Sequence, residues 1–129
     1  MDYKISSHSV YNINYHIVFC PKRRKKCLVE DIATTLKDLL QQIAERNSWN
    51  LQAVEVMPDH VHIFVGCSTK DSPHKIVKTF KGGTARIMRD TFPQLRKIPA
   101  MWSNSYYCGT VGNVSATVVK SYIANQKGK

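Results

Sequence analysis

The sequence predicts an α+β fold in which two helices cover one face of an antiparallel sheet. Short segments that alternate apolar and polar residues, as half-buried strands do, recur along the chain. Two longer segments between them repeat their apolar residues at helical spacing. The chain has 129 residues, of which 43% are hydrophobic, so it can form one packed domain, and its length does not call for a second. We therefore expect a single domain over residues 1–129.

The first half of the chain predicts a strand followed by a helix. Apolar and polar residues alternate over residues 11–20, and Pro21 ends this strand before a basic connection at residues 22–26. A helix is expected over residues 31–47, where the apolar residues form one stripe. Asp31 is a suitable N-cap for it.

An antiparallel hairpin is expected next. Residues 49–57 and 60–66 have the composition of strands, and the Pro58-Asp59 dipeptide between them is typical of a tight turn. Strands joined by so short a connection pair antiparallel.

The second helix is expected to run from about residue 73 to 89. Ser72 is a good N-cap, and Pro73 suits the first helical position. Gly82 and Gly83 fall inside this helix, where each costs roughly 1 kcal/mol relative to alanine. A glycine pair allows another backbone to approach closely, and the approaching group is either DNA or a packed helix.

A loop at residues 93–99 leads to a fourth strand, expected over residues 101–108 because of its aromatic content. Gly109 and Gly112 flank a short linker to a last helix at about residues 115–126. The order β-α-β-β-α-β with a terminal helix predicts a ferredoxin-like sandwich, a topology that by itself does not decide the function.

Composition narrows the class of protein. Nineteen Lys and Arg against nine Asp and Glu give a net charge of +10, which indicates a polyanionic partner, nucleic acid before a lipid surface. A basic protein without such a partner is the alternative. No apolar run is long enough to span a membrane, and residues 1–10 lack the apolar core of a signal peptide. The four cysteines form no C-x-x-C pair and fit no zinc spacing, so we expect free thiols in a cytoplasmic protein.

The pattern His60-Val61-His62 lies inside the third expected strand. Strand alternation places both imidazoles on one face and Val61, Ile63 and Val65 on the other, which belongs under the helices. The histidines are about 6.6 Å apart along the strand, so they can converge on one metal ion. Two ordinary polar strand positions are the alternative.

Tyr122 and Gln126 lie four residues apart in the last expected helix, so both project from one face. The amide oxygen of Gln126 suits a hard divalent ion, and the phenol of Tyr122 is a nucleophile once it is activated. An amphipathic tail helix with a tyrosine at its rim explains the same spacing.

Three motifs together resemble the single-tyrosine HUH transposases, the TnpA proteins of single-stranded-DNA insertion sequences. They are residues 57–65 (MPDHVHIFV), residues 102–112 (WSNSYYCGTVG) and Tyr122-x-x-x-Gln126, in the order and spacing of that family. The first strand with its basic connection (YNINYHIVFCPKRRK) is also similar, so the resemblance covers nearly the whole chain.

The resemblance implies a mechanism. His60, His62 and Gln126 would hold a divalent ion, Mg²⁺ or Mn²⁺, and the helix at 115–126 would carry Tyr122 as the nucleophile. Tyr122 would cut single-stranded DNA at the hairpin ends of an insertion sequence, giving a 5′-phosphotyrosine link that is rejoined to another 3′-OH. It also implies a homodimer in which the tyrosine helix can cross to the partner's site. Asp59 and His16 are the candidates for the general base, although a turn residue and a structural or DNA contact are their plainer interpretations.

DNA contacts are expected from the basic connection, from one side of the second helix and from two aromatic residues. They are Lys22, Arg23, Arg24, Lys75, Lys78, Arg86, Arg89, Tyr106 and Tyr107. A solvated basic face, and sheet core for the two tyrosines, are the alternatives. At the level of the whole protein the alternatives are a domesticated relative that processes palindromic repeats, a non-catalytic nucleic-acid-binding module, and a phosphodiesterase that uses water as its nucleophile.

Overall fold

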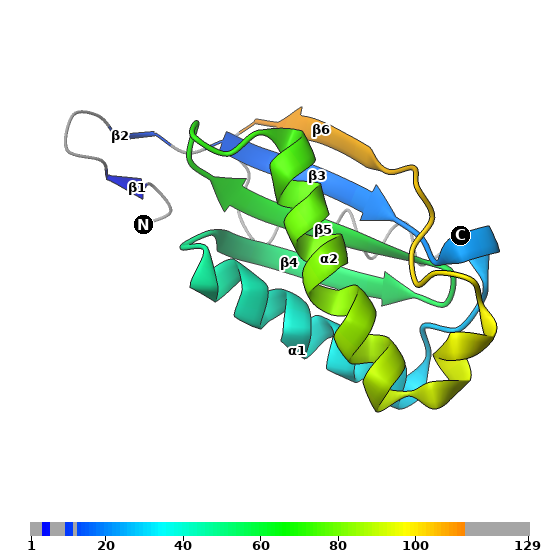
Figure 1. Ribbon diagram of the computed structural model, residues 1–129. Helices are drawn as coiled ribbons and strands as arrows, with labels where there is room; N and C mark the ends of the chain where they lie inside the picture. Colours follow the sequence, from blue (N-terminus) through cyan, green and yellow to red (C-terminus); the bar gives the residue numbers. More distant parts are fainter. Residues whose placement is uncertain (1–3, 6–9, 12, 113–129) are drawn as a thin grey trace.

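A four-stranded antiparallel sheet with two helices across one face forms the body of the protein (Figure 1). The computed structural model describes residues 4–5, 10–11 and 13–112. In chain order, the sheet strands and the helices are β3 (Ile13–Phe19), α1 (Glu30–Arg46), β4 (Asn50–Met57), β5 (His60–Cys67), α2 (Pro73–Thr91) and β6 (Tyr107–Val111). The sheet order β4-β5-β3-β6, antiparallel at each pairing, is the ferredoxin-like arrangement, so the predicted fold class is confirmed.

Four short elements complete the described residues. The two-residue strands β1 (Lys4–Ile5) and β2 (Val10–Tyr11) pair with each other in a separate small sheet. The 3-10 helices η1 (Lys22–Arg24) and η2 (Pro93–Lys97) occupy the predicted basic connection and the predicted loop. No described helix is long and apolar enough to cross a membrane. The helix expected at 115–126, with Tyr122 and Gln126, lies outside the described residues.

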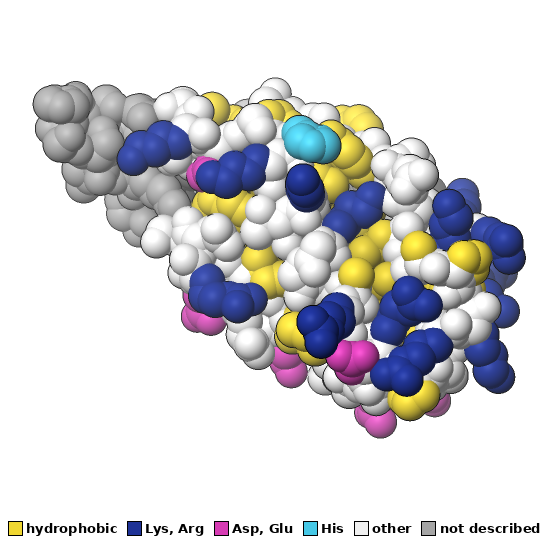
Figure 2. Space-filling view, viewed as in Figure 1, with side chains coloured by type: hydrophobic (Ala, Val, Ile, Leu, Met, Phe, Trp, Pro, Cys, Tyr) yellow, Lys and Arg dark blue, Asp and Glu magenta, His cyan; other side chains and the backbone are white. Residues whose placement is uncertain are grey.

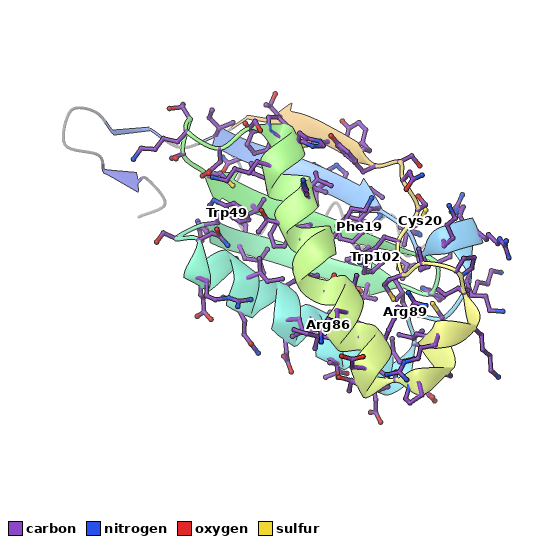
Figure 3. All side chains as sticks on the ribbon, viewed as in Figure 1. Phe19, Cys20, Trp49, Arg86, Arg89 and Trp102 are labelled. Carbon is purple, nitrogen blue, oxygen red and sulfur yellow. The ribbon has the colours of Figure 1, made fainter. Side chains whose placement is uncertain are left out.

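The fourth strand differs most from its prediction. It was expected over residues 101–108, but β6 begins at Tyr107 and runs to Val111. The apolar residues before it are core anchors instead: Met101 and Trp102 are buried, and the indole of Trp102 donates to the Thr84 hydroxyl at 3.0 Å. Figure 3 shows Trp102 beside Phe19, whose ring it meets edge-on. Gly109 therefore lies inside a strand and not in a linker.

The other boundaries shift by a few residues. The first sheet strand starts at Ile13, because Tyr11 belongs to β2. Helix α1 is capped by Val29 in an extended conformation, so the prediction of Asp31 as N-cap was wrong. Asp31 lies in the first helical turn, where its charge complements the helix dipole. Ser72 does cap α2, accepting from the Lys75 backbone N–H at 3.1 Å.

The core lies between the sheet and the two helices. Val61, Ile63 and Val65 of β5 are fully buried there, as the strand alternation predicted. Helix α2 runs unbroken through Gly82 and Gly83. A Cβ built on Gly83 would lie 2.7 Å from the Cδ1 of Ile43 in α1, whereas one on Gly82 would meet nothing within 4 Å. Gly83 therefore serves the packing of one helix on the other.

Candidate active site on the open face of the sheet

Two histidines of β5 stand together on the sheet face that the helices leave open. Strand β5 starts at His60, directly after the Pro58-Asp59 turn, and alternation turns His60 and His62 away from the buried valine face. Their ring centroids are 4.9 Å apart, with the ring planes at 75°. His62 is buried, with 7% of its surface exposed, while the side chain of His60 is 23% exposed. The sequence prediction of a histidine pair on the open face is confirmed.

The Asp59 carboxylate is hydrogen-bonded to one nitrogen of His60. The Oδ1 atom of Asp59 lies 2.7 Å from His60 Nδ1, and its Oδ2 accepts from the Arg24 guanidinium at 3.1 Å. The bond to His60 is the largest cause that lowers the pKa of the Asp59 carboxyl, and Arg24 lowers it further. An ionised carboxylate only accepts hydrogen bonds, so Nδ1 of His60 carries the proton. The Nε2 atom of His60 is then the one with a lone pair for a ligand.

The His16 imidazole is hydrogen-bonded to one nitrogen of His62. His16 on the neighbouring strand β3 places its Nε2 atom 3.0 Å from His62 Nδ1. The His16 ring stacks on Phe64, with centroids 4.3 Å apart and planes 3° from parallel. Burial, followed by the charges of His60 and His16, lowers the pKa of His62 to about 4, against a smaller opposing effect of Glu55. Burial also lowers the pKa of His16. Both rings are neutral at pH 7, so one nitrogen of the bonded pair donates and the other accepts.

The histidines open onto a hollow of about 500 Å³. Its wall combines the end of β3, the histidines of β5, one arginine of η1 and the residues that lead into β6: Val18, Phe19, Cys20, Arg24, His60, His62, Ser105, Tyr106 and Tyr107. Arg24 reaches this wall from a left-handed backbone conformation (φ 51°) that a non-glycine residue adopts at a cost on the order of 1 kcal/mol. The hollow thus offers imidazole nitrogens, a guanidinium and aromatic rings to one ligand.

Two of the three expected metal ligands, His60 and His62, lie among the described residues. Neutral imidazoles bind divalent transition ions, and a ligating histidine commonly has its other nitrogen held by a carboxylate or another acceptor. Within residues 13–112, no group of three or more His, Cys, Asp or Glu side chains is placed to hold an ion. The third expected ligand, Gln126, and the expected nucleophile, Tyr122, lie outside the described residues.

The expected DNA contacts divide between two faces. Arg24 lies at the hollow, and Lys22 and Arg23 share its 3-10 helix. The basic residues of α2 lie on the helical face, where Figure 2 shows Lys and Arg side chains gathered over α2 and the adjoining edge. Most of these have partners: Lys75 pairs with Asp71 at 3.2 Å, Arg86 with Asp90 at 3.7 Å, and Arg89, labelled beside Arg86 in Figure 3, donates to the Ile98 carbonyl at 3.1 Å. Lys78 belongs to the same helix.

Two tyrosines border the hollow and are not sheet core. Tyr106 and Tyr107 are 40% and 57% exposed.

The bond between His16 and His62 was not predicted, since it joins residues 46 positions apart. The only indication of this bond in the sequence was that His16 lies on the polar face of the first predicted strand.

The chain is similar to known transposases over most of its length. A family model described as "Transposase IS200 like" matches residues 9–126. The ISDra2 transposase TnpA of Deinococcus radiodurans is 36% identical over 123 residues, which cover 93% of this chain and 88% of that protein. The IS200 transposase of Salmonella typhimurium is 27% identical over 128 residues, covering 97% and 84%.

Two solved structures are similar as well. The crystal structure of a protein assigned as a transposase, from Deinococcus radiodurans, superposes with a TM-score of 0.78 at 38% identity, covering 95% of this chain and 97% of that one. A REP-associated tyrosine transposase, solved bound to a REP hairpin, has a TM-score of 0.58 at 13% identity, covering 94% and 68%, and shows likeness of fold. The family model spans most of the chain, and the first relative exceeds 30% identity over nearly its whole length. The chain therefore belongs to the IS200-like transposase family.

Proposed function

We propose that this transposase cuts and rejoins single-stranded DNA with Tyr122 as its nucleophile, beside a divalent ion held by His60, His62 and Gln126. One observation carries the proposal: both histidines have Nδ1 engaged by a neighbouring side chain, which leaves Nε2 of each for a ligand on the open face.

The donor set suits a divalent ion. Two neutral imidazoles with an amide oxygen mix nitrogen and oxygen ligands, which fits Mn²⁺ and, with more water in its shell, Mg²⁺. When bound, such an ion withdraws charge from the oxygens of an adjacent phosphate. Asp59 and His16 each bond to one of the ligands, so we assign to them the positioning of these rings and not the removal of the tyrosine proton.

The covalent step exchanges one phosphodiester for another. The phenol oxygen of Tyr122 bonds to phosphorus and loses its proton, while the bond from phosphorus to the 3′ oxygen breaks and that oxygen takes up a proton. The products are a 5′-phosphotyrosine and a free 3′-OH, and the reverse step with another 3′-OH rejoins the strand without an external energy source. Because Arg24 lines the hollow, we assign to it a contact with this phosphate or with the next phosphate along the strand.

We infer that the partner is DNA with hairpin ends and that the protein acts as a homodimer. The net charge of +10 favours a polyanion, and the REP-associated relative was solved bound to a hairpin. Each chain offers one nucleophile, whereas an element has two ends to cut, so two copies are needed in one complex.

Adduct formation tests the chemistry. Hairpin oligonucleotides from the element's own ends, labelled at the 5′ or the 3′ end, are incubated with protein and Mn²⁺ or Mg²⁺ and separated on a denaturing protein gel. A shifted protein band should carry only the label on the 3′ side of the cut, and it should require the metal. The variants Tyr122→Phe and His60→Ala should both abolish it.

Matched variants and products separate this function from its rivals. Tyr106→Phe removes a phenol from the hollow without touching the proposed nucleophile, and it should keep the adduct. Free 5′-phosphate without an adduct would indicate a phosphodiesterase that uses water. Hairpin binding with neither product would leave a non-catalytic binding module.

A further inference from the structure

Two adjacent aromatic side chains are exposed at the hollow without serving the core. Tyr106 and Tyr107 are 40% and 57% exposed, and both line the hollow that contains His60 and His62. Within the described part of the chain, the other large hydrophobic side chains with comparable exposure are Val29 and Ile87. Neither of those borders the hollow, so the exposed aromatic surface coincides with the histidine site.

The ring of Tyr107 is held in place by its own strand. Val18 of β3 is in register with Tyr107 on one side and with His62 on the other, so Tyr107 and His62 lie in one row on the same sheet face. Their strands are separated by β3, which corresponds to about 10 Å across the sheet. A Cβ built on Gly109 would collide with the Tyr107 phenol oxygen and lie 3.0 Å from its Cζ atom. Glycine at this position therefore lets the ring lie over the strand, and the His16 ring meets it edge-on at 5.6 Å.

Tyr106 is supported from the helical layer. The Lys81 ammonium of α2 lies 5.9 Å from the centre of the Tyr106 ring and donates to the Ser103 carbonyl at 2.6 Å. The backbone N–H of Ser103 in turn donates to the Cys20 carbonyl at 2.9 Å. The segment before β6 is thus tied to both α2 and the end of β3, which fixes the tyrosines relative to the histidines.

We propose that Tyr106 and Tyr107 form a stacking platform for an unpaired nucleobase next to the phosphate that is cut. Aromatic side chains bind bases of single strands by stacking, whereas the faces of a paired base are already covered within a duplex. A hollow of about 500 Å³ with imidazoles on one side and phenol rings on the other accommodates a nucleotide whose phosphate and base reach the two sides. This inference rests on the proposed function, because it takes the histidine side as the position of the phosphate.

A base-deletion scan tests the platform. Binding is measured by fluorescence anisotropy on the Tyr122→Phe protein, so that no cleavage intervenes, with hairpin oligonucleotides carrying one abasic site at each unpaired position in turn. One position should weaken binding by roughly 5- to 150-fold, the fold-change that corresponds to about 1–3 kcal/mol per stacked base. Adding Tyr107→Leu or Tyr106→Leu should weaken binding of the intact oligonucleotide and abolish most of the effect of that abasic site.

Three further variants make the result specific. Tyr107→Phe keeps the ring and should preserve the effect of that abasic site, whereas Ile87→Ala removes an exposed side chain away from the hollow and should bind like the parent. Gly109→Ala makes the end of the Tyr107 ring shift but keeps the ring, so it should weaken binding of the intact oligonucleotide less than Tyr107→Leu does. Abasic effects that stay the same with and without both rings would overturn the platform. Absence of an adduct with the parent protein and metal, together with an intact abasic pattern, would overturn the proposed chemistry and leave the platform standing.

Discussion

Replacing Asp59 by alanine tests whether the histidines are held for a metal. Asp59 bonds to His60 Nδ1 at 2.7 Å and to Arg24 at 3.1 Å, and its side chain is only 22% exposed. Without the carboxylate, His60 loses the partner that fixes both its ring orientation and the nitrogen that carries the proton. We therefore expect Asp59→Ala to weaken metal binding while leaving the buried face of β5 intact.

The expected loss is about 10- to 100-fold in metal affinity, which is typical when the partner of a ligating histidine is removed. Loss of the Asp59 charge alone explains only part of this decrease in metal affinity. Two unit charges 4 Å apart in water interact by about 1 kcal/mol, which corresponds to roughly fivefold in affinity. Asp59→Asn keeps an oxygen acceptor and removes the charge. Its loss should therefore stay within roughly fivefold, well short of the alanine variant.

The assay follows free Mn²⁺ by electron paramagnetic resonance during titration of the protein without DNA, so the result does not depend on cleavage. Asp90→Ala is the matched control, since it removes another arginine-paired carboxylate, at the C-terminal end of α2. Thermal unfolding of each variant shows whether the fold is kept. Mn²⁺ affinity within twofold of the parent for Asp59→Ala, in a folded protein, would refute the positioning role.

Three other expectations follow from the same structure. Gly82→Ala should raise the free energy of unfolding by up to about 1 kcal/mol in urea titrations, whereas Gly83→Ala should lose that gain, because its Cβ presses on a buried isoleucine of α1. The pKa of His62 is about 4 in the folded protein and about 6.5 in the unfolded chain, so its contribution to stability is present above pH 6.5 and is lost as the pH falls. In the presence of a chelator, we expect the free energy of unfolding to drop by about 2 kcal/mol between pH 7 and pH 5, and to change less with pH for His62→Gln. If the tyrosine helix acts in the partner's site, mixing His60→Ala with Tyr122→Phe protein should restore adduct formation, and a tyrosine that acts in its own chain should leave the mixture inactive.

The elements that the sequence predicted well carry redundant signals. Strand β5 combines a turn dipeptide before it with strict alternation, and so the faces of His60 and of Val61 were assigned correctly. Helix α2 was predicted from its serine cap and the proline that follows. Where only composition was available, the prediction failed: Trp102 indicated a strand, but it is a buried anchor bonded to Thr84. Aromatic residues favour strands and cores alike, and composition does not separate the two.

The partners of the histidines follow from register, which a single sequence does not encode locally. A shift of β3 by one residue against β5 would turn His16 to the helical side and leave His62 Nδ1 without its imidazole partner. The shift would also place alternate residues of β3, such as Ile17, on the open face, so burial of the helical face enforces the pairing. The apolar residues of the core thus determine the geometry of the polar site on the other face. Substitutions that loosen the core of β3 should therefore disturb metal binding before they unfold the protein.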